Sequence, residues 1–146
     1  MSEERYSLTM DPYPQETKEA TKLYRFYELL REGKLTTTKC KDCSDLMWPP
    51  RTVCPECLCD DLDWVELPKS ASIYSFSVQV GGIPPGYEAE APLVYAIIEF
   101  GNGMRMLTRI VESNSEDLKV GAQVELKVID IPRDRVIPYF KLKTSA

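Results

Sequence analysis

Hydrophobic side chains near the start of the chain recur with the period of an α-helix. Between residues 17 and 32 the apolar positions follow an i, i+3, i+4, i+7 spacing, and most charged side chains lie off that face. The apolar positions are Ala20, Leu23, Tyr24, Tyr27 and Leu30. Gly33 follows where a helix C-cap is expected. The pattern predicts a helix over residues 17–32, preceded by a tail of residues 1–14 in which prolines block regular structure.

After about residue 70 the period of the pattern changes from 3.6 to 2, as expected of half-buried strands. Residues 74–80 alternate apolar and small polar side chains, and residues 93–100 are apolar almost throughout. The sequence Gly101-Asn102-Gly103 is typical of a hairpin turn, because these residues readily take a positive φ. Three further strands are predicted at residues 104–110, 124–128 and 137–143, with one helical turn near residues 115–118.

The strongest chemical signal is a pair of Cys-x2-Cys motifs, Cys40/Cys43 and Cys54/Cys57, with ten residues between them. Two such turns can bring four thiolates to one tetrahedral zinc ion at about 2.3 Å each, which leaves no position for water or substrate. The predicted cofactor is therefore a structural Zn²⁺. The alternatives are an iron site, disulfides and buried apolar cysteines, and an odd cysteine count argues against disulfides. The fifth cysteine, Cys59, is a substitute ligand for Cys57, a redox-sensitive thiol or a surface residue.

Five short strands in the second half of the chain favour a small barrel, with an OB-like barrel as the leading interpretation and a two-sheet sandwich as the alternative. We therefore expect a mostly β protein with an N-terminal helix, a rubredoxin-like zinc ribbon and an OB-fold-like five-stranded barrel. The expected boundaries are residues 1–33 for the tail and helix, 34–66 for the zinc ribbon and 67–146 for the barrel.

Composition narrows the function classes further. The sequence contains no histidine, which removes histidine bases, histidine metal ligands and Ser/His or Cys/His nucleophilic pairs. A net charge of −5 and a pI of about 4.9 make the chain a poor candidate for non-specific binding to polyanions. No apolar run reaches the ~18 residues of a membrane-spanning helix, and the acidic start lacks the apolar region of a secretory signal. We expect a cytoplasmic protein.

The order of these elements resembles the family of zinc-ribbon and OB-fold proteins associated with acyl-CoA metabolism. The resemblance covers residues 17–143 and rests on the helix, the two cysteine pairs, the Trp-Pro-Pro-Arg sequence at residues 48–51, Trp64 and the barrel. Two positions depart from the family pattern: Ser44 replaces a usual glycine, and Leu93 replaces a common aromatic residue. Further matches are Pro92 and Gly103-Met104-Arg105.

The resemblance implies a non-catalytic partner of thiolase-superfamily enzymes, not an enzyme. Archaeal members resemble scaffolds that join acetoacetyl-CoA thiolase to hydroxymethylglutaryl-CoA synthase, with the barrel helping to hold the CoA-linked intermediate. The expected partners are thus a thiolase-superfamily enzyme, with hydroxymethylglutaryl-CoA synthase as one candidate, and acyl-CoA or CoA. Candidate partner surfaces are the aromatic face of the helix around Tyr24 and Tyr27, the barrel strands and the loop of residues 81–92. The alternative function is a nucleic-acid-binding OB-fold and zinc-ribbon module, which the acidic pI disfavours.

Basic side chains on the third and fifth predicted barrel strands are the candidates for contacts with CoA phosphates. Arg105 and Arg109 lie on one face of their strand, and Lys141 and Lys143 lie on one face of theirs. Paired cations suit a compact polyanion such as a phosphate group. A solvated barrel exterior is the alternative, because lysine and arginine are ordinary residues there.

Overall fold

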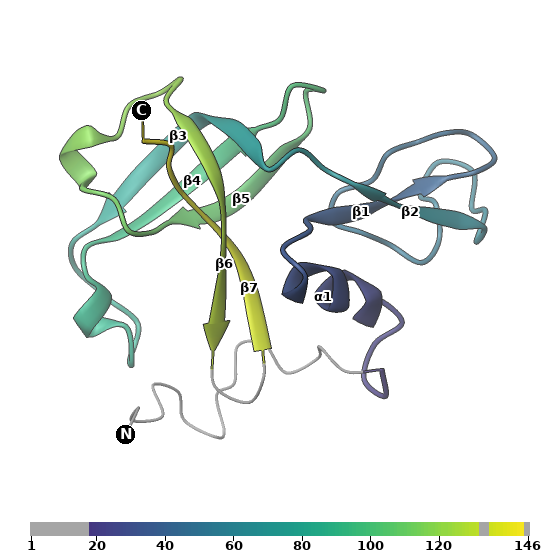
Figure 1. Cartoon of the computed structure of the whole chain (residues 1–146), viewed down its shortest axis with the longest axis horizontal. Coiled ribbons are helices and arrows are strands. Elements are labelled where there is room, and N and C mark those ends of the chain that lie inside the picture. The colour runs from purple at the N-terminus through teal and green to yellow at the C-terminus, as the bar shows by residue number, and fades with distance from the viewer. Residues whose placement is uncertain (1–17, 132–134, 145–146) are drawn as a thin grey trace. The chain divides into compact units, whose positions relative to one another are not determined.

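The computed structural model describes residues 18–131 and 135–144, which belong to two compact units (Figure 1). The first unit contains the described residues up to Lys69, and the second begins at Ser70. The expected tail of residues 1–14 and the expected start of the helix at residue 17 lie outside the described residues. Within the described ranges, no helix has the length and apolar character needed to cross a membrane.

Helix α1, Tyr24–Arg31, is shorter than the helix that the pattern predicts. Residues 18–20 and 22–23 form turns instead of helix, and Thr21 between them belongs to neither a turn nor a helix. The hydroxyl of Thr21 accepts a hydrogen bond from the amide of Leu23 (3.1 Å), a local bond that competes with helical pairing of the backbone. At the other end Gly33 takes a φ of 80°, and its amide bonds to the carbonyl of Leu30 (2.8 Å). The predicted glycine cap is confirmed.

The buried face of α1 is rotated relative to the predicted one. Tyr24 and Tyr27, which belong to the predicted apolar face and to a candidate partner surface, are only half-buried. A phenylalanine ring has no hydroxyl that must keep a hydrogen-bond partner, so Phe26 is the easier aromatic residue to bury. Its ring lies 6.1 Å from the ring of Trp48, which joins the helix to the segment between the two cysteine pairs. The buried side chains of α1 are Phe26, Leu29 and Leu30.

Two short antiparallel strands frame the cysteine-rich segment: β1, Thr36–Cys40, and β2, Leu62–Glu66. The pattern predicts neither strand, since β1 reads Thr-Thr-Thr-Lys-Cys and shows no alternation of apolar and polar residues. Its three threonines are nevertheless buried, and their β-branched side chains suit a strand. Residues 46–48, between the two cysteine pairs, form no strand, and Leu46 makes only an isolated bridge with Lys39.

The second unit is a closed barrel with the strand order β3-β4-β5-β7-β6 (Figure 1). Neighbouring strands are antiparallel except β5 and β7, which are parallel and meet at Ile110 and Phe140. This closed five-stranded barrel is consistent with an OB fold, as predicted, and it excludes the two-sheet sandwich. The strands are β3 (Ser70–Gln79), β4 (Leu93–Glu99), β5 (Arg105–Ile110), β6 (Gln123–Ile131) and β7 (Arg135–Leu142).

Alternate residues of the barrel strands point into a core of their own. On β5, Arg105 and Leu107 are exposed, whereas the residues after each of them are buried. Phe100 and Phe140 are both fully buried in this core, with ring centroids 6.3 Å apart. Two short 3-10 helices lie in the connections between strands: η1 (Glu88–Glu90) between β3 and β4, and η2 (Ser115–Asp117) between β5 and β6. The second coincides with the helical turn predicted near residues 115–118.

Candidate metal centre and tyrosine pocket

The Sγ atoms of Cys40, Cys43, Cys54 and Cys57 lie within 4.8 Å of one another. The sulfur atoms of Cys40 and Cys57 are 3.5 Å apart, and those of Cys43 and Cys54 are also 3.5 Å apart. The first cysteine of each pair is buried and the second is exposed. The structure therefore gathers all four predicted ligands at one place in the first unit.

The two cysteine turns repeat the same backbone geometry. The amide of Cys40 bonds to the carbonyl of Asp45 (2.9 Å), and the amide of Cys54 bonds to the carbonyl of Cys59 (2.8 Å), five residues further along in both cases. The amide of Cys43 points to the sulfur of Cys40 at 3.5 Å. Turns of this kind aim the thiols of each pair in the same direction and supply backbone donors to them.

This set of donors fits a zinc ion. In a tetrahedron with Zn–S bonds of about 2.3 Å, neighbouring sulfur atoms are roughly 3.8 Å apart, close to the 3.5 Å of the two nearest pairs. The amide of Cys43 lowers the pKa of Cys40 to about 7. The amide of Cys59 also lowers the pKa of Cys57, but burial and the neighbouring thiols outweigh it and raise that pKa to about 12. A divalent cation would offset the repulsion among four thiolates at this spacing.

Threonine side chains of β1 fix the segment that lies between the two cysteine pairs. The hydroxyl of Thr38 accepts a hydrogen bond from the amide of Arg51 (2.9 Å) and donates one to its carbonyl (3.0 Å). The hydroxyl of Thr37 donates a hydrogen bond to the carbonyl of Met47. These bonds satisfy buried hydroxyls and hold the second cysteine pair in register with the first.

Cys59 lies beside the four-cysteine cluster without belonging to it. It is half-buried and packs against the buried group of Cys40, Met47 and Cys54. Its sulfur accepts a hydrogen bond from the amide of Asp61 at 3.3 Å. Cys59 therefore serves as the control cysteine when the four clustered cysteines are tested as metal ligands.

Ser44 and Leu58 each follow the second cysteine of a pair, and their φ angles are 64° and 63°. A left-handed backbone of this kind costs a residue with a Cβ atom roughly 1–2 kcal/mol. Glycine, the usual residue of the family at position 44, does not have that cost. The first turn thus keeps its geometry despite the serine.

Replacement of Ser44 with glycine is expected to stabilise the ribbon by about 0.5–1 kcal/mol, because the strain relieved exceeds the additional chain entropy that glycine loses on folding. Since zinc binding and folding are linked, the apparent zinc affinity should rise roughly two- to fivefold in a chelator competition. Thr52→Gly, at an exposed position of the same unit without a positive φ, is the matched control and should lower the affinity. Equal effects of the two glycines would contradict the argument.

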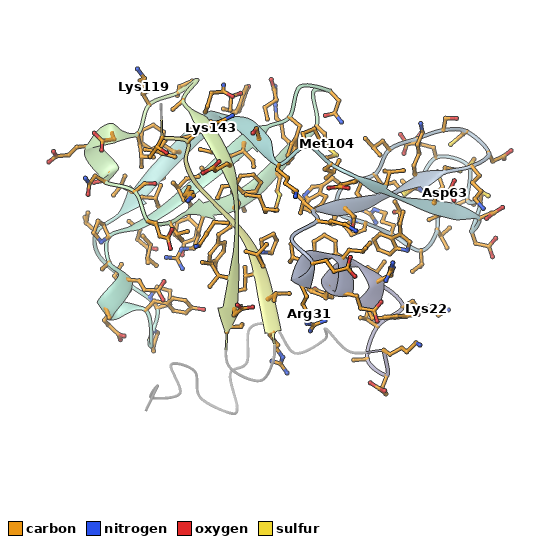
Figure 2. The ribbon with its side chains drawn as sticks, viewed as in Figure 1. Lys22, Arg31, Asp63, Met104, Lys119 and Lys143 are labelled. Atoms are coloured by element: carbon orange, nitrogen blue, oxygen red, sulfur yellow. The ribbon has the colours of Figure 1, made fainter. Side chains whose placement is uncertain are left out.

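The four basic residues predicted to contact phosphate have separate surroundings in the structure. Arg105 bonds to Glu99 (2.6 Å), Lys141 pairs with a glutamate of β6 (3.5 Å), and Lys143, which follows β7, is exposed (Figure 2). Four positions along a strand span about 13 Å. Both side chains would therefore have to lean toward each other to hold one phosphate group between them.

Arg109 points away from the barrel core and is nevertheless buried, with only 9% of its side chain exposed. Its Nη2 donates to the carboxylate of Glu90 (3.0 Å). Its Cζ lies 5.7 Å from the ring centroid of Tyr87 and 5.1 Å from that of Tyr139. Burial lowers the pKa of Arg109, but Tyr139 and Glu90 raise it by more, so the group stays charged. Arg109 thus ties the loop of residues 81–92 to β5 and β7.

A cavity of about 290 Å³ adjoins Arg109, and the sequence pattern does not predict it. Tyr95 reaches it from β4, Tyr139 from β7 and Tyr87 from the loop between β3 and β4. Strand alternation could have placed Tyr95 and Tyr139 on the outer face, but a loop residue such as Tyr87 has no such periodicity. We call this cavity the tyrosine pocket; it is lined by Pro84, Tyr87, Tyr95, Leu107, Thr108, Arg109 and Tyr139.

Comparison with known proteins identifies the family. Residues 28–63 match the rubredoxin-like zinc ribbon domain of ChsH2, and residues 64–128 match its C-terminal OB-fold domain. The chain belongs to this ChsH2 family of zinc-ribbon and OB-fold proteins. A DUF35 domain-containing scaffold protein of Methanocaldococcus jannaschii is 34% identical over 114 residues, which are 75% of this chain and 80% of that relative. The resemblance predicted from the order of elements is confirmed.

Two further relatives carry names of enzymes. A probable enoyl-CoA hydratase alpha subunit of Thermomonospora curvata is 28% identical over 116 residues, which cover 80% of this chain but 36% of that longer protein. Among solved structures, a chain of the Ltp2-ChsH2(DUF35) aldolase matches with a TM-score of 0.72 at 27% identity, over 82% of this chain and 93% of that chain. Chains similar to this one over most of its length therefore also carry the names of enzymes or of enzyme complexes.

Proposed function

We propose that this protein is a non-catalytic scaffold that binds a thiolase-superfamily enzyme and helps to hold a CoA-linked intermediate. The observation that carries the proposal is the similarity to scaffold proteins across both the ribbon and the barrel. The names of the hydratase subunit and of the aldolase support an enzyme as the partner, and the hydratase name supports acyl-CoA chemistry.

The ligand set supports a structural role for zinc. Cys40, Cys43, Cys54 and Cys57 would hold the ion and fill all four positions with sulfur, and the ion would link the end of β1 to the turn before β2. Bound zinc would supply a cross-link that a unit with two short strands and one short helix otherwise lacks. Because the chain has no histidine, no imidazole base is available to it. We infer that the catalytic groups come from the partner.

Contacts between CoA phosphates and Arg105, Arg109, Lys141 and Lys143 stay a prediction. The surroundings support Lys143 most and Arg109 least. The guanidinium of Arg109 is already bonded to Glu90 in a buried position, so a phosphate would have to displace a carboxylate there. Lys143 is exposed, so a phosphate could approach its ammonium group from solvent. Lys141 and Arg105 are also within reach of solvent, but each is paired with a glutamate.

The test is to purify the tagged full-length chain from its source organism, identify the enzyme that stays with it through gel filtration, and re-express both. We expect a stoichiometric complex that binds acyl-CoA more tightly than the enzyme alone, and no turnover by the scaffold alone. Turnover by the pure chain, after a check for contaminating enzyme, would make it an enzyme. Retention of single-stranded nucleic acid in a salt-sensitive manner, with no acyl-CoA enzyme, would favour the alternative function.

A further inference from the structure

The outer face of β4 and β5 carries apolar surface that the barrel core does not use. Leu107, in the middle of β5, is 70% exposed. Ile97, its partner on β4, is half-buried on the same outer face. An isolated exposed leucine is ordinary, but apolar residues that join into a continuous surface mark sites of interaction.

The tyrosine pocket is continuous with this surface, because Leu107 also lines the pocket. Its volume of about 290 Å³ lies at the lower end of the roughly 300–1,000 Å³ of small-molecule sites. The space therefore suits one large side chain better than a whole cofactor. Tyrosine and arginine, which line it, are the residue types enriched at the centres of protein interfaces.

The pocket wall is held in place by contacts within the chain. Arg109 bonds to Glu90 and lies against the ring of Tyr87, which fixes the far wall to β5. Within the same loop, the carboxylate of Glu88 accepts a hydrogen bond from the amide of Gly86 (2.8 Å). A wall that is ordered before binding lowers the entropic cost of association.

The charges on this face favour a protein segment over a phosphate ligand. Arg105 and Arg109 are each bonded to a carboxylate, Glu99 at 2.6 Å and Glu90 at 3.0 Å, so both cations are compensated. Glu88, which follows the pocket residue Tyr87 in the loop, is exposed and brings a third carboxylate, so these two positive and three negative groups sum to −1. With both cations paired, these groups attract a polyanion only weakly, and the additional carboxylate is complementary to a basic protein surface.

We propose that the face formed by Ile97, Leu107 and the tyrosine pocket is the docking surface for the partner enzyme. A large apolar side chain of the enzyme occupies the pocket, and a lysine or arginine beside it lies near Glu88. The inference rests on the proposed function and deepens it, since it says where on this chain the thiolase-superfamily enzyme binds. It also gives Arg109 a role as a positioning residue for the pocket wall.

The test measures binding of full-length variants to the purified enzyme that co-purifies with the wild-type chain. Leu107→Asp puts a charge at the centre of the proposed interface and should raise the Kd at least about 30-fold. Val120→Asp is the matched control, because Val120 is 67% exposed in the same unit. Lys119 is the neighbour of Val120, and Met104 immediately precedes β5, the strand that carries Leu107. The side chains of Lys119 and Met104 lie well apart (Figure 2). The control should change the Kd less than twofold, and both variants should keep the wild-type zinc content and circular dichroism.

Two further measurements locate the contact directly. A photo-reactive amino acid at position 107 should cross-link to the enzyme, whereas the same residue at position 120 should not. Glu88→Lys should slow association several-fold at low salt, because it reverses the charge that faces the basic side chain of the enzyme.

The outcomes separate this inference from the proposed function. If Leu107→Asp binds the enzyme as the wild-type chain does, the docking surface is wrong and the scaffold function stands. If the wild-type chain binds no such enzyme, the scaffold function is wrong and the docking surface falls with it. Loss of acyl-CoA binding with normal enzyme binding would make the pocket a ligand site, and loss of self-association would make the face an interface between copies of the chain. Either result overturns the proposal.

Discussion

Cys40→Ser is expected to abolish zinc binding and to unfold the first unit while the barrel stays folded. Structural zinc contributes an apparent 10–16 kcal/mol, roughly, in isolated zinc-binding modules. The first unit has one short helix and two five-residue strands, and its size falls in the range where a small core needs a metal or disulfide to be stable. The barrel has its own buried core around Phe100 and Phe140, so its stability does not depend on the metal.

Elemental analysis should find one zinc per chain in the wild-type protein and none in Cys40→Ser. Hydrogen exchange should then show loss of protection in α1, β1 and β2 but not in β3–β7, and removal of zinc from the wild-type protein by a chelator should give the same pattern. Cys59→Ser is the control and should keep one zinc. A Cys40→Ser chain that still holds zinc would contradict the four-cysteine assignment, and loss of that zinc in Cys40→Ser/Cys59→Ser would assign Cys59 as a replacement ligand.

The metal cluster could be predicted from the sequence because its chemistry depends on a few residues at short spacing. Two Cys-x2-Cys turns contain most of the geometry that a tetrahedral site needs, and only one further condition, that the turns meet, comes from the fold. The barrel strands were predictable for a similar reason. Alternation along β5 records which side chains face the core, and the hairpin turn at Gly101-Asn102-Gly103 predicts that β4 and β5 pair.

The strands of the ribbon could not be predicted from alternation. Thr36, Thr37 and Thr38 are consecutive and all buried, which no period of two describes. Thr37 and Thr38 can be buried because their hydroxyls bond to the segment between the cysteine pairs, at residues 10 and 13 positions further along, which a local pattern does not reveal. The helix began later than its pattern for a related reason, since the hydroxyl of Thr21 bonds locally instead.

Strand parity predicts the face on which Arg109 lies but not its burial. Parity correctly assigns it to the outer face of β5, and an arginine there is expected to meet water. Its burial depends on the loop of residues 81–92, which carries Tyr87 and Glu90 over the strand. A loop has no hydrophobic period that fixes where it packs, so neither the covered guanidinium nor the tyrosine pocket could be derived before the fold was known.

Phe140→Ala is expected to destabilise the barrel by about 3–5 kcal/mol, because it removes a fully buried ring and leaves a cavity beside Phe100. Phe140 also stands at the point where β7 meets β5 and closes the barrel, so its backbone neighbours cannot easily collapse into the space. For a unit of this size the loss should lower the melting temperature of the barrel by more than about 10 °C.

The matched control for Phe140→Ala is Tyr74→Ala, which removes a ring of similar size from the outer face of β3. Tyr74 is 47% exposed and stacks on Arg105 at 3.7 Å, an exposed contact worth about 0.5–1 kcal/mol. It should therefore shift the barrel's stability by about 1 kcal/mol or less. Because the ribbon unit has its own core and metal ligands, Phe140→Ala should still bind one zinc per chain. Loss of zinc from Phe140→Ala under conditions where its barrel is unfolded would show that the two units fold as one, and would contradict the independence on which both this prediction and that for Cys40→Ser depend.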